Sequence, residues 1–289
     1  MNEPPHQRDD TPRLSPVRPP KPIRVLLGLR ERLVIDGVRY RELSPESLRR
    51  ALSRRGPGHK DFAVRFPAGR RMRIRVTSWR SYEDLTGPVL LRLYERVGTM
   101  IRPGSRVLAL RAGTGYAAAW LARRVGPSGA IVSIDDDEES VRYARWRYPA
   151  DNIAFELSRQ APHDDLRGET DGAFQAALLV HAVRASDDAE AMLAECMRVV
   201  EPGGWVYLAS PRRVADEARA AGDPCDPMPM TRESMSDLIA RAHGRVGSEP
   251  YTIQWRGESE DPHVAAEIRL GAPETGGRAR GANLEEGPA

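Results

Sequence analysis

A glycine-containing turn and a carboxylate form the clearest chemical pattern in this 289-residue chain. The turn Leu110–Gly115 follows the apolar run 105–110, which is typical of a buried strand. Glycines in such a turn let the backbone bend sharply and let a ligand approach without a clash at Cβ. Asp135 ends a second apolar run about 20 residues further on, where a carboxylate can accept hydrogen bonds from both ribose hydroxyls of an adenosine. Together they predict a site for an adenosine-containing ligand.

Other residues add candidates to this site. Asp136 follows Asp135 directly and is a second candidate for the ribose contact. His181 lies at the end of the fourth predicted strand, where an imidazole acts as a general base toward an acceptor or only lines the pocket. Cys196 and Cys225 lack the close paired spacing of a zinc site, so no metal site is predicted.

Strands that alternate with helices from residue 84 onward position these residues. This alternation predicts an α/β fold with a doubly wound, mostly parallel seven-stranded sheet. The last two strands have no helix between them, so we expect an antiparallel hairpin at one edge. The predicted strands cover 105–110, 130–135, 152–157, 173–183, 203–210, 245–255 and 263–270.

A small basic α+β module over 23–80 precedes this domain. Asp36-Gly37 between two apolar runs is a hairpin signal, 44–55 has the pattern of a capped helix, and 62–76 has that of two strands. Residues 1–22 and 272–289 are expected to be disordered tails.

Charge is distributed unevenly along the chain. Residues 1–80 hold 20 Lys and Arg against 8 Asp and Glu, although the whole chain has a net charge of only +3. A basic segment of this kind either contacts a nucleic-acid backbone or is a solvated face. The sequence has neither an apolar run long enough to cross a membrane nor the apolar core of a secretory signal at its start. We therefore expect a cytoplasmic protein with no membrane partner.

The spacing of the glycines discriminates between adenosine cofactors. Gly113-x-Gly115-x-x-Ala118 also fits a dinucleotide fingerprint, but Arg111 and Ala112 separate the strand from the first glycine. The spacing instead resembles the D/E-x-G-x-G-x-G pattern of class I S-adenosylmethionine-dependent methyltransferases, which aligns with residues 109–115. Further stretches resemble the same family: 174–183 its fourth strand, 189–210 its helix and "L-K-P-G-G" turn, and 231–246 its last helix. The resemblance covers roughly 84–271.

The resemblance implies S-adenosylmethionine as cofactor and His181 as the candidate catalytic residue. The cofactor-binding residues that it implies are Leu110, Arg111, Ala112, Gly113, Thr114, Gly115, Asp135, Asp136, Arg159 and His181.

The chain also departs from the family pattern. Ala109 stands where the family usually has the acid that positions the methionine amino group. Arg111 replaces the first glycine, so its side chain must point away from the methionine end or partly fill the pocket. Ser158–Gln160 lacks the carboxylate that often lies near adenine, and Gln175 replaces a common aspartate.

Several functions remain open at this point. The acceptor is a small molecule, with 23–80 as a lid, or RNA or protein bound by that module. A stretch at 101–108 resembles transfer-RNA adenine methyltransferases, and the turn with its second strand resembles protein isoaspartate methyltransferases, but neither acceptor-site signature is present. Ala109 and Arg111 favour a third alternative, a catalytically inactive interaction or regulatory protein. A nicotinamide oxidoreductase is the most distant alternative.

Overall fold

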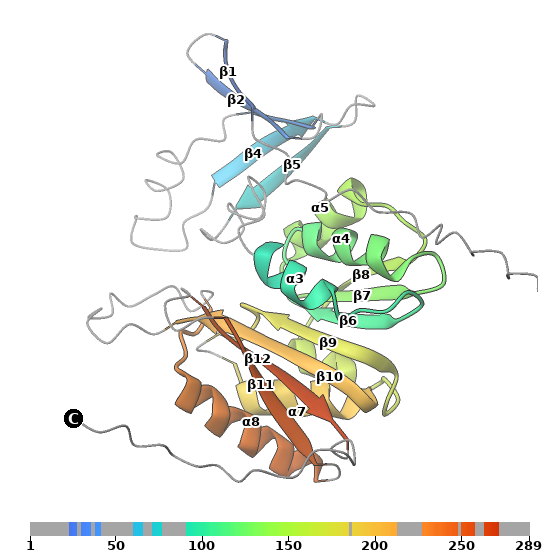
Figure 1. Cartoon of the computed structure of the whole chain (residues 1–289). Coiled ribbons are helices and arrows are strands. Elements are labelled where there is room, and N and C mark those ends of the chain that lie inside the picture. The colour runs from blue at the N-terminus through green and yellow to red at the C-terminus, as the bar shows by residue number, and fades with distance from the viewer. Residues whose placement is uncertain are drawn as a thin grey trace, which may run out of the picture.

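A seven-stranded sheet forms the body of the computed structural model, which describes 91–271 apart from 185–186, 213–226, 248–249 and 258–262, and five strands between residues 23 and 76. In spatial order the sheet consists of β11 (Tyr251–Arg256), β12 (His263–Leu270), β10 (Val200–Pro211), β9 (Phe174–Val180), β6 (Arg106–Leu110), β7 (Ala130–Asp135) and β8 (Ile153–Leu157) (Figure 1).

The strand directions follow from the connections. Helices separate the strands from β6 to β10, and these pair in parallel, whereas β12 runs antiparallel to both β10 and β11. Leu108 and Leu178, on the central strands β6 and β9, are fully buried because helices cover both faces of the sheet. The predicted doubly wound sheet with an antiparallel edge hairpin is therefore confirmed.

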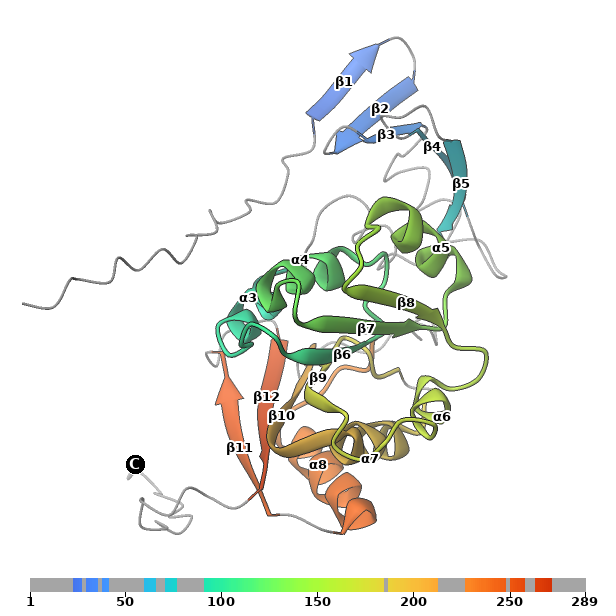
Figure 2. The same ribbon diagram turned by 90° about the vertical axis from the view of Figure 1, so that its right-hand side faces the viewer.

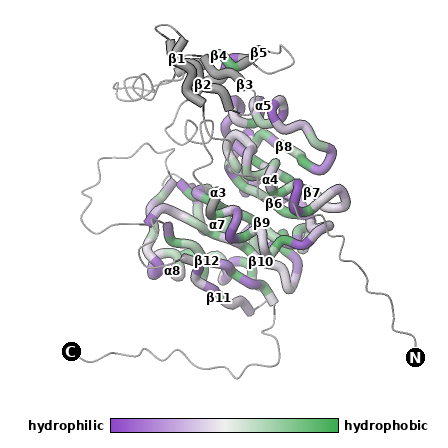
Figure 3. The backbone as a smooth tube through the Cα atoms, turned by 45° about the horizontal axis from the view of Figure 1, so that its top comes forward, coloured by the Kyte–Doolittle hydropathy of each residue, from purple (hydrophilic) through white to green (hydrophobic). Residues whose placement is uncertain are grey.

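Helices form a layer on each face of the sheet (Figure 2). One apolar core joins the sheet to α3 (Leu91–Gly98), α4 (Tyr116–Val125) and α5 (Glu138–Arg147). The other joins it to α6 (Pro162–Leu166), α7 (Ala189–Val199) and α8 (Arg232–Val246). Apolar residues gather on the inner strands, and polar residues on the outer turns of the helices (Figure 3). None of the described helices is long and apolar enough to cross a membrane.

The N-terminal strands form a separate antiparallel sheet of five strands in chain order. They are β1 (Ile23–Leu27), β2 (Arg30–Ile35), β3 (Val38–Arg41), β4 (Lys60–Arg65) and β5 (Arg71–Val76). The predicted hairpin is present, with Ile35 paired to Val38. Arg142 of α5 donates a hydrogen bond to the carbonyl of Arg73 at 2.6 Å, so β5 contacts the main domain. The predicted tails and the helix over 44–55 lie outside the described residues.

Candidate functional site

The order of the strands reverses between β6 and β9, which is where sheets of this kind have their ligand crevice. The chain moves from β6 outward to β7 and β8, then returns to the other side of β6 and continues through β9 and β10. Ligands of such sheets bind at this reversal, outside the carboxyl ends of the strands. Leu110, Asp135 and Val180 end β6, β7 and β9, so the predicted site residues next to them share this edge of the sheet.

The turn after β6 contains residues in the left-handed region of backbone conformation. Arg111, Gly113 and Gly115 all have positive φ values, of 50°, 61° and 83°. A Cβ at Gly115 would lie 2.6 Å from Cβ of Ala144 and 2.7 Å from Cε1 of Phe155. Gly115 therefore allows the first turn of α4 to approach α5 and β8 closely, which is a packing role that the sequence argument did not assign to it.

Asp135 lies at the centre of the edge and is only 4% exposed. Its Oδ2 accepts a hydrogen bond from the backbone N–H of Gly113 at 2.8 Å, and its Oδ1 accepts one from the N–H of Asp137 at 3.0 Å. The structure thus brings Asp135 and the glycine turn together, as the sequence predicted.

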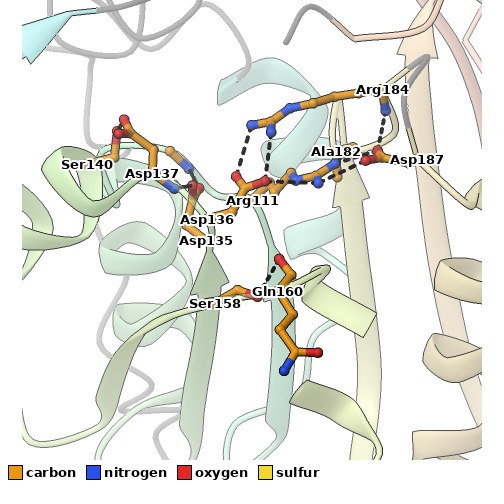
Figure 4. A network of polar contacts seen from close by, with 11 residues as sticks. Arg111, Asp135, Asp136, Asp137, Ser140, Ser158, Gln160, Ala182, Arg184 and Asp187 are labelled. Carbon is orange, nitrogen blue, oxygen red and sulfur yellow. Dashed lines mark hydrogen bonds and ion pairs between the residues drawn. The ribbon is translucent and has the colours of Figure 1, made fainter. Parts of the chain in front are cut away.

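A network of four charged residues spans the three strand ends (Figure 4). Arg111 forms a bidentate ion pair with Asp187, with N–O distances of 2.5 and 3.0 Å. It also donates a hydrogen bond to the carbonyl of Ala182 at 2.6 Å. Its Nη2 also lies 3.0 Å from Oδ2 of Asp136. Arg184 contacts both oxygens of Asp136, at 2.7 and 3.0 Å. The guanidinium of Arg111 therefore lies across the crevice between β6 and β9.

The environment explains why this arginine remains charged although its side chain is only 4% exposed. Burial alone lowers the pKa of Arg111, but the hydrogen bonds and negative charges of Asp187 and Asp136 outweigh burial and raise it. A buried charge is tolerated only when it is paired. Removing one member of the network would therefore leave an uncompensated charge at the edge of the sheet.

Two histidines meet at the same edge. His181 follows β9 directly, is 8% exposed and has a φ of 53°, a region that side-chain-bearing residues seldom adopt. Its ring centroid lies 4.9 Å from that of His263, the first residue of β12. Backbone strain of this kind concentrates at functional sites. His263 was missed in the sequence because its position depends on the register between β12 and β10.

The remaining predicted residues differ in their surroundings. Leu110, Ala112 and Thr114 are buried beneath the turn, whereas Arg159 is exposed after β8. Gln175 lies at the opposite edge, where its side chain accepts a hydrogen bond from the N–H of Arg106 and donates one to Glu201. Within the described part of the chain, no group of three or more His, Cys, Asp or Glu could hold a metal ion.

Comparison with known proteins adds the family. Residues 108–208 match the model of the family described as a methyltransferase domain. The predicted resemblance to methyltransferases is confirmed over these residues.

Several known proteins are similar to this chain over part of their length. The ubiquinone/menaquinone biosynthesis C-methyltransferase UbiE of Hydrogenovibrio crunogenus is 32% identical over 108 residues, which are 37% of this chain and 42% of that protein. The arsenite methyltransferase of Aquipseudomonas alcaligenes is 31% identical over 132 residues, 43% of this chain and 38% of that protein. The chain thus spans less than half the length of these relatives. A solved S-adenosylmethionine-dependent methyltransferase from Aquifex aeolicus is 21% identical, with a TM-score of 0.47, over 64% of this chain and 95% of that chain.

The residues of the site fit the nucleoside half of the cofactor. Asp135 is a buried carboxylate, a group that accepts hydrogen bonds from ribose hydroxyls, and Gly113 beside it has no side chain. The other half of the crevice differs from the family pattern. It holds the Arg111–Asp187 ion pair, where the family usually has a glycine and an acid on the strand.

The sequence did not indicate where the side chain of Arg111 points, and in the structure it reaches Asp187 in the loop after β9. Sequence reasoning also missed Arg184 and Asp187. A signal was present: an arginine in a turn that must be buried needs a carboxylate, and Asp187 and Asp188 follow the neighbouring strand.

Proposed function

We propose that this chain binds S-adenosylmethionine at the carboxyl edge of β6 and β7 and transfers its methyl group to an acceptor. One observation carries the proposal: the buried carboxylate of Asp135 at the switch point, joined to the glycine turn by the N–H of Gly113. When bound, the cofactor supplies a methyl group attached to a positively charged sulfur. The family match over 108–208 supports the same activity.

The chain's own residues would contribute chiefly by positioning and by excluding water. Asp135 would orient the ribose, and the rigid turn would fix the distance of the nucleoside from β6. His181 follows β9 and its ring lies 4.9 Å from that of His263, so an acceptor bound there would meet two imidazoles. We therefore retain His181 as the candidate base.

A calorimetric titration of the full chain with S-adenosylhomocysteine tests the proposal. The wild-type protein should bind, and Asp135→Asn should weaken binding by about tenfold or more, because one hydrogen bond to a charged group is lost. Asp151→Asn is the matched control, since Asp151 is exposed in the turn before β8 at the other edge of the sheet. Thermal melting of each variant separates loss of binding from loss of fold. Absence of wild-type binding at millimolar ligand would favour an inactive interaction protein instead.

A further inference from the structure

The Arg111–Asp187 pair has an unusual place for a structural ion pair. It connects the turn after β6 to the loop after β9, and so it bridges the two walls of the ligand crevice. The two side chains are only 4% and 11% exposed, and the contact is two-pronged. A ligand that extends from Asp135 toward the loop after β9 would therefore meet both members of this pair.

Electrostatics restricts what can open the pair. A ligand that merely displaced Arg111 would leave Asp187 buried and unpaired, which costs several kcal/mol by comparison with other buried pairs. A ligand can open the pair cheaply only if it brings an anion for the guanidinium and a cation for the carboxylate. An α-amino acid group carries both charges, on an ammonium and a carboxylate that are bonded to the same carbon atom.

The rest of the network tolerates the opening. Arg184 makes its own two-pronged contact with Asp136, so Asp136 stays neutralised if Arg111 turns. The N–H of Arg184 donates to Oδ2 of Asp187 at 2.6 Å, which holds that carboxylate in place on its loop. Ala109 is apolar and fully buried, so β6 itself offers no carboxylate to an ammonium group at this point.

We propose that Arg111 and Asp187 form the recognition pair for the amino-acid end of the cofactor, paired with each other until the ligand replaces both contacts. Arg111 takes the ligand's carboxylate, and Asp187 takes its ammonium group in place of the acid that Ala109 replaces. This inference rests on the proposed cofactor binding, and it assigns positioning and specificity roles to two residues that carry no part of the methyl transfer.

A ligand series measured by calorimetry on the full wild-type chain tests the inference. S-adenosylhomocysteine carries both charges, its decarboxylated form keeps only the amine, and 5′-methylthioadenosine has neither. We expect S-adenosylhomocysteine to bind about tenfold or more tightly than either of the other two, because only it supplies both replacement contacts. If 5′-methylthioadenosine binds as tightly as S-adenosylhomocysteine or more tightly, the pair blocks the amino-acid end of the ligand instead of binding it, and the inference is wrong.

A charge-neutral double variant, Arg111→Gln with Asp187→Asn, gives the second test without leaving an unpaired charge. The preference for S-adenosylhomocysteine over 5′-methylthioadenosine should fall to about threefold or less, because both ionic contacts are lost. The control is Arg198→Gln with Glu195→Gln, which removes another arginine–carboxylate pair, on α7, and should leave the preference unchanged. A rise in S-adenosylhomocysteine affinity in the first double variant would overturn the inference while leaving the proposed function intact.

Failure of the proposed function looks different. If neither the wild type nor any variant binds any of the three ligands, cofactor binding itself is refuted, and the recognition pair with it. If the Arg111 and Asp187 double variant does not fold, as judged by circular dichroism, the ligand series on the wild-type chain alone decides.

Discussion

Replacing Gly115 with alanine should damage the fold before it affects any ligand. A Cβ at this position would overlap Cβ of Ala144 and the ring of Phe155, at 2.6 and 2.7 Å. Its φ of 83° adds backbone strain, about 1–2 kcal/mol for an L-residue in the left-handed region. Overpacking in a well-packed interior costs a further 1–3 kcal/mol, roughly. We therefore expect Gly115→Ala to lower the free energy of unfolding by about 2–5 kcal/mol.

Gly247 provides a matched control because it has a similar backbone conformation, with φ 69° and ψ 17° against φ 83° and ψ 5° at Gly115. No heavy atom of the described residues lies within 4 Å of a Cβ built at Gly247. Gly247→Ala should therefore cost only the backbone strain, about 1–2 kcal/mol. The difference between the two variants isolates the overlap at Gly115.

Urea unfolding at equilibrium measures both values, provided that the denaturant slope stays at the wild-type value. Equal costs for the two variants would refute the packing argument. Wild-type stability of Gly115→Ala together with lost S-adenosylhomocysteine binding would show that this glycine serves the ligand rather than the approach of α4 to α5.

Three further predictions concern other parts of the chain. Burial raises the pKa of the Cys196 thiol, so its tryptic peptide should remain unlabelled by iodoacetamide at pH 8 until the protein unfolds. The N–H of Ala191 lowers the pKa of Asp188, which caps α7, so Asp188→Ala should cost about 1 kcal/mol at pH 7. Because the carboxylate gives this stability only above its unfolded pKa of about 3.9, the difference from wild type in urea midpoints should vanish as the pH falls below the lowered folded value. If residues 1–80 contact RNA, the affinity of the full chain for RNA, measured by filter binding, should fall as the salt concentration rises. For each phosphate contact, a tenfold rise in salt should lower the logarithm of the association constant by about 0.7, and a flat response would exclude that contact.

Much of the fold was predictable because it depends on local patterns. Apolar runs such as Val107–Leu110 and Phe174–Val180 predict buried parallel strands, since both faces of a central strand meet helices. The absence of a helix between β11 and β12 predicts their antiparallel pairing. The short helix α6 was missed because five residues carry too little periodicity to be recognised.

The geometry of the site was less predictable because it depends on partners far apart in the chain. The direction of the Arg111 side chain is set by a φ of 50° and by Asp187 on another loop. The meeting of His181 and His263 requires the register of β12 against β10, in which Pro211 pairs with His263. Residue types indicate that a buried Arg111 needs a carboxylate, but they determine neither which carboxylate it contacts nor that the two histidines meet.

The chain's departures from the family pattern are of two kinds, one at each edge of the sheet. At the amino edge, Gln175 replaces an acid but satisfies the N–H of Arg106 and the carboxylate of Glu201, so that substitution maintains the fold. At the carboxyl edge, Ala109 and Arg111 remove one negative charge and add one positive charge inside the crevice. Asp187 on the facing loop offsets the positive charge of Arg111. A change of that second kind alters which ligand charges the crevice can accept, because buried charges must be balanced either within the protein or by the ligand.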